Sequence, residues 1–435
     1  MNQPIGLSLD QAPPIGVPLR FFLTAPWFSL AAALLLLWQG PALFSSRWNP
    51  AMLGATHLLT LGHMGLIMGG AMLQMLPVVA GTPVRQPLAV ARTVHILGTC
   101  GIVLFSVGLA FSLPLALKAA LPILGTAVLL FAVVALVTLS RARPENMTAR
   151  AMRFAALMLA ATATLGMTLL SNHALGWWLQ DRVSVTNLHL TWGLLGWVGV
   201  LVIGVAYQVV PMFQLTPAYP ARLTRWLAAM LFVLLLALIP ASLSPAWRLL
   251  PGTLLAAGYA TFALTTLWLQ SKRRRKLPDV TLDFWRGAML SLLLAIALWL
   301  AGQVFPGLSD NESYGFLLGL LMIVGFAMSA INGMLYKIVP FLTWFHLQSK
   351  RGPGGPTVPN VKAILPERRM RRQMWLHFAA LVTLLGAGVK PGIFSYPAAI
   401  LLGASSLWLW LNLVYACRIY RNVSAAIRQF KASAA

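Results

Sequence analysis

Seven histidines are the residues of this chain best suited to bind a metal or a cofactor. Neutral imidazole is the commonest metal ligand in proteins, and it is also a usual axial ligand of haem. Ionisable residues inside membrane-spanning segments are energetically costly and often mark function. Four of the seven histidines belong to three apolar segments and are expected at a similar depth in the outer half of a membrane. They are His57, His63, His173 and His189.

These four histidines are compatible with more than one site. A single histidine in a membrane helix most often makes a hydrogen bond to a neighbouring helix, whereas four at one depth favour a metal or haem site. His57 and His189 could ligate one b-type haem from two sides, or each could ligate a haem of its own. His63 and His173 could add a copper ligand or a further haem ligand, and the sequence does not rank these alternatives.

Methionines follow the first of these histidines along the same segment. On an ideal α-helical wheel, Met64, Met68, Met72 and Met75 fall within about 60° of His57. Soft thioethers suit Cu(I), so Met64 and Met68 join the candidate metal ligands. The simpler interpretation is packing in the core or against lipid, where methionine fills irregular space.

The remaining ionisable residues suggest less. His346 and His377 are expected at the cytoplasmic edge, where surface roles suffice, and His95 in the cytoplasmic half of its span. Lys337 is expected to extend toward the cytoplasmic surface as an anchor. All eight carboxylates fall in tails, loops or span edges, which weighs against a proton pump or an ion-coupled antiporter. They are Asp10, Glu145, Asp181, Asp279, Asp283, Asp310, Glu312 and Glu367.

The elements that must position these residues are membrane helices. Of 435 residues, 59% are hydrophobic and 9% charged, and the mean hydropathy is +0.79. A soluble domain carries about 25% charged residues. A helix needs roughly 20 apolar residues to cross the hydrocarbon core. The sequence predicts an all-α polytopic membrane protein with twelve transmembrane helices, near residues 21–43, 51–78, 89–112, 116–139, 150–178, 187–213, 222–243, 248–271, 284–305, 314–342, 372–389 and 394–417.

The placement of the basic residues predicts the orientation. The net charge is +24, and most of it falls in the loops after every second span. Cytoplasmic loops are enriched in Lys and Arg, so both termini are expected in the cytoplasm. The run SKRRRK (residues 271–276) is interpreted as a topology anchor at anionic lipid, and no role in nucleic-acid binding is expected.

One pattern occurs three times at intervals of four spans. The frame G-x7-G-x3-[QK]-x2-P predicts a single membrane domain over residues 1–435, built from three four-helix units at about 21–140, 150–271 and 284–417, with a cytoplasmic linker at 346–371. Glycines allow close helix packing in membranes, and packing alone could explain the repeat. The members are Gly62, Gly70, Gln74 and Pro77, then Gly196, Gly204, Gln208 and Pro211, then Gly325, Gly333, Lys337 and Pro340.

The second copy of this frame resembles a known motif. The segment from His189 through Gly196-Trp197, Gly204, Tyr207 and Pro211 resembles the haem-ligating helix of haem-copper oxidase catalytic subunits, especially C-type oxidases and nitric oxide reductases. That family has twelve helices in three pseudo-repeats with cytoplasmic termini and haems toward the outer face.

The chain also departs from this family. Thr191 stands where the family has a second histidine. The tenth predicted span, 314–342, contains no histidine, and the vicinal histidine pair of the family's copper site is absent. The full binuclear centre is therefore not expected. The chain is also similar, more loosely, to stand-alone haem- and copper-containing proteins of the NnrS type. The residues that carry this similarity are Arg20-Phe21-Phe22 and a Trp-x-Pro at 48–50.

The resemblance implies a haem b protein, possibly with copper as well, in the inner (cytoplasmic) membrane of a bacterium. Such a protein would handle electrons or a diatomic gas such as nitric oxide or oxygen, with a protein or quinol electron donor and possibly a partner subunit. The alternative is a Cu(I) transporter or copper-supply protein, and a third reading is a scaffold without cofactor. Partners for haem propionates are expected in the outer loops, namely Arg47, Arg182 and Arg248 with Trp48, Trp177 and Trp178.

Overall fold

The computed structural model describes residues 11–79, 81–176, 179–241, 245–274 and 277–433. These residues form helices and connecting loops, and no strand occurs among them. The elements are α1 (Gly16–Gln39), η2 (Gly40–Ser45), α2 (Pro50–His57), η3 (Leu58–Gly65), α3 (Leu66–Val79), α4 (Pro87–Ala110), α5 (Pro114–Leu139), α6 (Met147–Leu175), α7 (Arg182–Thr191), η4 (Trp192–Gly199), α8 (Val200–Gln214), α9 (Ala221–Ala241), α10 (Pro245–Ser271), α11 (Val280–Val304), α12 (Pro306–Ser309), α13 (Glu312–Leu320), η5 (Leu321–Met328), α14 (Ser329–Lys350), α15 (Val361–Ile364), α16 (Glu367–Val389) and α17 (Pro391–Ser433).

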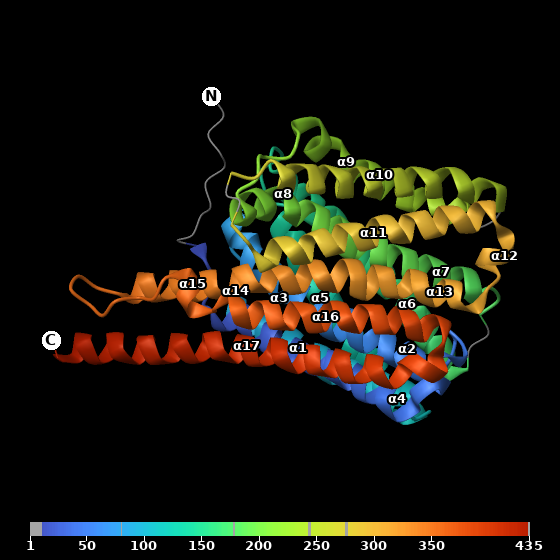
Figure 1. Cartoon of the computed structure of the whole chain (residues 1–435), viewed down its shortest axis with the longest axis horizontal. Helices are drawn as coiled ribbons and strands as arrows, with labels where there is room; N and C mark the ends of the chain where they lie inside the picture. The colour runs from blue at the N-terminus through green and yellow to red at the C-terminus, as the bar shows by residue number, and fades with distance from the viewer. Residues whose placement is uncertain (1–10, 80, 177–178, 242–244, 275–276, 434–435) are drawn as a thin grey trace.

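The long helices run side by side along one direction, and the start of α1 and the end of α17 lie at the same end of the bundle (Figure 1). In the described residues, 11 helical stretches are long and apolar enough to cross a membrane. The chain is therefore a multi-pass, all-helical membrane protein. The expected boundary between the third and fourth spans is confirmed, because α4 ends at Ala110 and α5 begins at Pro114.

Helix α16 corresponds to the remaining expected span, and it is not among those 11 stretches. Its polar side chains lower its mean hydropathy, and several of them face the protein interior. Gln373 and His377 are 0% and 1% exposed. The helix packs along α17 and lies within the bundle (Figure 1). The assignment of α16 as a twelfth crossing is therefore a proposal.

Three helices in the middle of the bundle each contain a π-helical stretch of eight residues, η3, η4 and η5. The first glycine of the sequence frame is the fifth residue of each stretch, at Gly62, Gly196 and Gly325. A π-helix bonds i to i+5 and is frequent at functional sites. Nothing in the sequence predicted these wide turns. Segment η5 contacts both η3 and η4, so the three wide turns lie together.

The frame glycines are sites of close helix approach. A Cβ atom added at any of them would collide with a side chain on a preceding helix, and the two neighbours on that helix are seven residues apart every time. The pairs are Gly62 with Phe28 and Gly70 with Phe21 of α1, Gly196 with Met158 and Gly204 with Ala151 of α6, and Gly325 with Ser291 and Gly333 with Phe284 of α11. Small residues allow this approach in membranes, so the glycines position the three inner helices.

Helix α17 packs along α1 and so joins the last part of the chain to the first. Trp27 and Trp410 meet with ring centroids 5.1 Å apart, and a Cβ atom at Gly40 would lie 2.6 Å from the Tyr396 hydroxyl. The φ of Gly40 is +57°, which favours glycine on conformational grounds as well.

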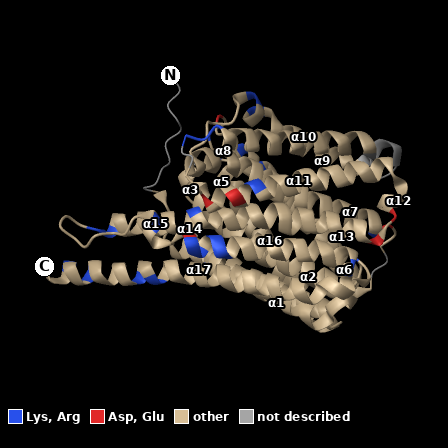
Figure 2. Ribbon diagram, viewed as in Figure 1, with Lys and Arg blue, Asp and Glu red and all other residues tan. Residues whose placement is uncertain are grey.

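Basic side chains gather at the end of the bundle where the two chain ends lie (Figure 2). This distribution agrees with the expected cytoplasmic side. The expected linker at 346–371 is shorter in the structure, because α14 continues to Lys350 and α16 begins at Glu367. Its middle packs on the extended end of α17, since Val358 and Ile427 share a small buried cluster with Leu347. A hydrophobic contact therefore holds the segment that was expected as a linker.

Candidate functional site

The strongest candidate site lies where α2 and α7 end, and both helices begin at residues with clear capping chemistry. The Asn49 side chain accepts a hydrogen bond from the backbone N–H of Ala51, and Pro50 follows it. The Asp181 side chain accepts from the N–H of Ser184 at the start of α7. Each histidine stands seven residues after the first residue of its helix, which places it roughly 10 Å along the helix axis.

His57 and His189 are close neighbours. Their ring centroids are 6.2 Å apart and their planes are inclined by 27°. Two imidazoles that bind one metal from opposite sides, with metal–nitrogen bonds of about 2.0–2.1 Å, have centroids roughly 6–6.5 Å apart. The separation therefore suits a single metal between the two rings.

Backbone carbonyls define the tautomer of both histidines. The Nδ1 atom of His57 lies 2.7 Å from the carbonyl oxygen of Leu53, and that of His189 lies 3.0 Å from the carbonyl oxygen of Thr162. A carbonyl can only accept, so Nδ1–H donates in each case and Nε2 keeps its lone pair. Metal-binding histidines almost always have such a partner on the second nitrogen.

The surroundings of the pair are apolar and close. Phe105 of α4 contacts His57 edge to face, with centroids 4.9 Å apart. A Cβ atom at Gly166 of α6 would lie 2.9 Å from Cε1 of His189. Two buried hydroxyls on these helices, those of Ser106 and Thr162, have no hydrogen-bond partner within the described part of the chain. Buried polar groups without partners are uncommon, and near a site they indicate a missing ligand or water.

The outer ends of α2 and α7 meet at a tryptophan between two arginines. The guanidinium of Arg47 lies 4.6 Å from the centroid of the Trp48 ring, and that of Arg182 lies 5.9 Å from the same centroid. Two of the arginines expected to bind propionates therefore lie at the starts of the two helices that carry the histidines. Trp177, Trp178 and the side chain of Arg248 lie outside the described residues.

The other two candidate histidines do not join this pair. His63 is 1% exposed, and both of its ring nitrogens have partners. Nδ1 lies 3.1 Å from the Ser29 hydroxyl of α1, and Nε2 lies 2.9 Å from Oδ1 of Asn332 on α14. His173 is exposed in the last turn of α6. The sequence predicted the depth of these residues, but the direction of each side chain depends on packing.

The expectation that His377 has a surface role is wrong. Its ring is buried, and Nε2 lies 2.8 Å from the Ser329 hydroxyl of α14. One turn earlier on α16, Gln373 accepts a hydrogen bond from the Tyr336 hydroxyl at 3.0 Å, and Asn412 of α17 donates to that hydroxyl at 2.9 Å. The apolar residues around these side chains in the sequence gave no signal that they form one interhelical network.

The four methionines after His57 are all buried, so they do not face lipid. Met68, Met72 and Met75 line a cavity of about 70 Å³ between α3, α8 and α14. The helical wheel assumed a continuous α-helix, but η3 lies between His57 and the methionines and its wider turn changes their relative direction. The assignment of Met64 and Met68 as copper ligands remains a prediction.

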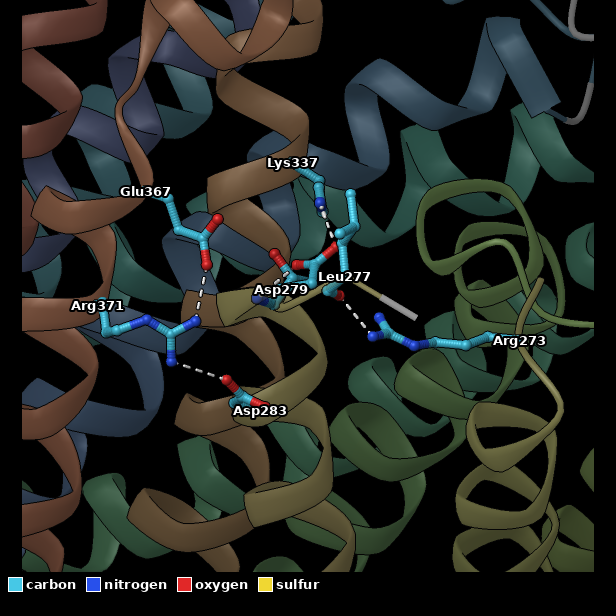
Figure 3. Close-up of polar contacts among 8 residues, drawn as sticks. Arg273, Leu277, Asp279, Asp283, Lys337, Glu367 and Arg371 are labelled. Atoms are coloured by element: carbon cyan, nitrogen blue, oxygen red, sulfur yellow. Dashed lines mark hydrogen bonds and ion pairs between the residues drawn. The ribbon is translucent and has the colours of Figure 1, made fainter. Parts of the chain in front are cut away.

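A charged cluster lies at the opposite, basic end of the bundle (Figure 3). Lys337 pairs with Asp279 at 2.7 Å, so it has a specific partner in addition to any anchoring role. Arg371 pairs with Glu367 at 2.7 Å and with Asp283 at 3.1 Å. Its hydrogen bond to Glu367, followed by that to Asp283, raises the pKa of the Arg371 guanidinium despite partial burial. Because each carboxylate has a cationic partner, we interpret this cluster as structural.

The donor set of the histidine pair limits what it can bind. In the described part of the chain, no three His, Cys, Asp or Glu residues group closely enough to hold a metal ion. Two nitrogens on opposite sides suffice for haem, whose macrocycle supplies the other four ligands. They also suffice for two-coordinate Cu(I). The pair therefore fits either group, and it fits a structural Zn²⁺ site poorly, because that would need four protein ligands.

No protein-family model and no curated protein matches this sequence. The functional argument therefore depends on the geometry of the chain itself.

Proposed function

We propose that this protein binds a b-type haem between His57 and His189 and uses it to carry electrons within the membrane. The observation that carries the proposal is the 6.2 Å separation of the two rings, with the Nδ1–H of each engaged by a backbone carbonyl. Each Nε2 atom then keeps the lone pair that ligation of a haem iron requires.

The residues around the pair would contribute in distinct ways. Leu53 and Thr162 hold the rings in orientation through their carbonyls. Phe105 would pack against the His57 ring, and Arg47 and Arg182 would supply positive charge for propionates at the outer end. A bound haem supplies reversible one-electron chemistry at its iron.

If His57 and His189 both held the iron, the haem would supply electron transfer in preference to the reduction of nitric oxide or oxygen. The proposal extends to an unidentified electron donor, protein or quinol, and to a possible partner subunit. Placement of the site at the outer face of a bacterial inner membrane, with both termini cytoplasmic, is part of the same proposal.

The architecture is included in the proposal as three four-helix units with twelve crossings, α16 among them. The supporting observations are the three glycine frames, the seven-residue spacing of their packing partners, and the equivalent positions of η3, η4 and η5. The resemblance to haem-copper oxidases agrees with such units, and the chain would be a divergent, stand-alone relative.

A Cu(I) site at the same two histidines is the second candidate. Two imidazole nitrogens can also coordinate copper. In that case the protein would transport or supply copper, and its visible spectrum would contain no haem band.

Spectroscopy of the purified protein, expressed with added haem precursor, tests the proposal. We expect a Soret band and a reduced α band, both lost or strongly altered in His57→Ala and in His189→Ala. His173→Ala is the matched control, because this exposed histidine lies at the same end of the bundle. A colourless protein that co-purifies copper would support the second candidate, and a protein with neither haem nor copper would contradict both.

A further inference from the structure

A second candidate site borders the ion-paired cluster of Figure 3, at the basic end of the bundle. It is a cavity of about 620 Å³ beside the starts of α11 and α16. Its charged lining consists of the three carboxylates of that cluster and four cationic side chains, which are Arg273, Arg286, Lys362 and Arg371. We refer to it as the basic cavity.

Positive charge exceeds negative charge around the basic cavity. Lys337 pairs with one of the carboxylates, so five cationic side chains stand beside three acidic ones. The site therefore carries an excess of two positive charges. Helices α11 and α16 both begin here, and the positive end of a helix dipole also favours an anion. These charges select a negatively charged occupant.

Three of the cations are available to bind such an occupant, because the carboxylates pair with Lys337 and Arg371. In the described part of the chain, Arg286 and Lys362 have no hydrogen-bond or ion-pair partner, and Arg273 donates to a single backbone carbonyl (Figure 3). Guanidinium groups suit phosphate, to which they can donate two parallel hydrogen bonds, and an ammonium adds a point charge. The three donors belong to three segments of the chain. A phosphate group presents oxygens in several directions, so it can accept from all of them.

An exposed apolar surface continues from the basic cavity along both helices. Leu290 and Leu294 follow Arg286 at intervals of one turn on α11, and they are 54% and 59% exposed. Trp375 follows Arg371 by one turn on α16 and is 64% exposed. The two helices are in contact, and tryptophan is enriched where a membrane meets water. A molecule with a phosphate head and hydrocarbon chains would contact both the cavity and this surface.

We propose that the basic cavity binds the phosphate-bearing headgroup of an anionic phospholipid, from the leaflet at this end of the bundle. Helix α11 is one of the stretches able to cross a membrane and begins at the cavity, so the cavity lies at the level of the headgroups. Arg273, Arg286 and Lys362 hold the phosphate, and the exposed leucines of α11 contact the acyl chains. Basic pockets between membrane helices on the cytoplasmic side typically bind such lipids. The inference is independent of the haem proposal, because no residue of the histidine pair lines the cavity.

Native mass spectrometry of the full-length protein tests this site, with phosphatidylglycerol as the anionic probe and phosphatidylcholine as the zwitterionic one. We expect phosphatidylglycerol to bind roughly tenfold more tightly or better, because only its headgroup has a net negative charge. Arg286→Gln and Lys362→Gln should each weaken it roughly fivefold, and the double variant roughly 25-fold. Both side chains are exposed and unpaired, so the variants are expected to fold. Arg222→Gln is the matched control and should bind as the parent does, since this exposed arginine at the start of α9 does not line the cavity.

Inorganic phosphate and glycerol phosphate distinguish a lipid site from a site for a soluble phosphate. Neither should displace phosphatidylglycerol, because neither reaches the apolar surface of α11, and displacement by either anion would overturn the lipid assignment. Equal affinity for the two lipids would overturn the inference, as would equal losses in Arg222→Gln and Arg286→Gln. Because lipid binding is measured without reference to haem, failure here is distinguishable from failure of the haem proposal.

Discussion

Gly166 provides the most direct test of the His57–His189 geometry. It faces the His189 ring from α6, one helical turn after Thr162, whose carbonyl accepts from Nδ1 of that ring. A single turn of α6 therefore supplies both the hydrogen-bond acceptor and the space for the ring. Gly166→Ala removes the space and leaves the acceptor in place.

The size of the perturbation follows from the distances. The added Cβ atom would lie 2.9 Å from Cε1 of His189, whereas carbon atoms in contact prefer about 3.5–4.0 Å. The ring must move by about 0.6 Å. Metal–ligand distances vary by only about 0.2 Å, so His189 cannot keep both its hydrogen bond and its bond to iron. Alanine in place of glycine meanwhile favours the helix by about 1 kcal/mol.

We therefore expect Gly166→Ala to remain folded but to bind haem 10- to 100-fold more weakly, as for loss of a supporting contact. Haem titration of the apoprotein and electron paramagnetic resonance measure the affinity and the low-spin, two-histidine signal. Gly98→Ala is the control, because its added Cβ atom would meet Leu66 at an ordinary 3.9 Å. An unchanged affinity and low-spin signal in the folded variant would refute the axial role of His189.

Three other perturbations test the packing and the polar contacts. In Gly204→Ala the new Cβ atom would collide with an alanine side chain of α6. The free energy of unfolding should fall by about 1–3 kcal/mol, as measured by thermal unfolding in detergent. Gly69→Ala is the control, because its Cβ atom would make an ordinary contact at 3.8 Å, and its stability should not change. His63→Leu should lower the unfolding temperature through its lost hydrogen bonds but leave the α band unchanged, and loss of that band would contradict the structural role given to this residue. A double-mutant cycle of Lys337→Met and Asp279→Asn should give a coupling of about 1–3 kcal/mol, and additive effects would show that the pair contributes nothing.

The sequence was sufficient to predict features that depend on overall composition and on the position of a residue along its span. Long apolar segments predicted the membrane helices, and Pro114 marked the break between two of them. The pairing of His57 with His189 was among the predicted alternatives, because both residues stand near the start of their spans, five and seven residues before the first frame glycine. Depth follows from position along a span, and position can be read from the sequence.

Direction around a helix could not be read in the same way. The helical wheel that placed the methionines on the same face as His57 assumed α-helical periodicity. Segment η3 interrupts that periodicity, and no proline or charged residue in it signals the interruption. His63 shares the depth of His57, yet it contacts Ser29 and Asn332 in the interior of the bundle. Such contacts depend on which helices are neighbours, and that information comes from packing.

The contact between α1 and α17 has a consequence for biosynthesis. Helix α17 leaves the ribosome roughly 375 residues after α1, which at about 5–20 residues per second is a delay of about 20–75 s. During that time the face of α1 that will contact α17, Trp27 included, is covered by lipid or by the insertion machinery. The bundle therefore closes late, and a chain interrupted before α17 would expose an unpaired first helix to membrane quality control.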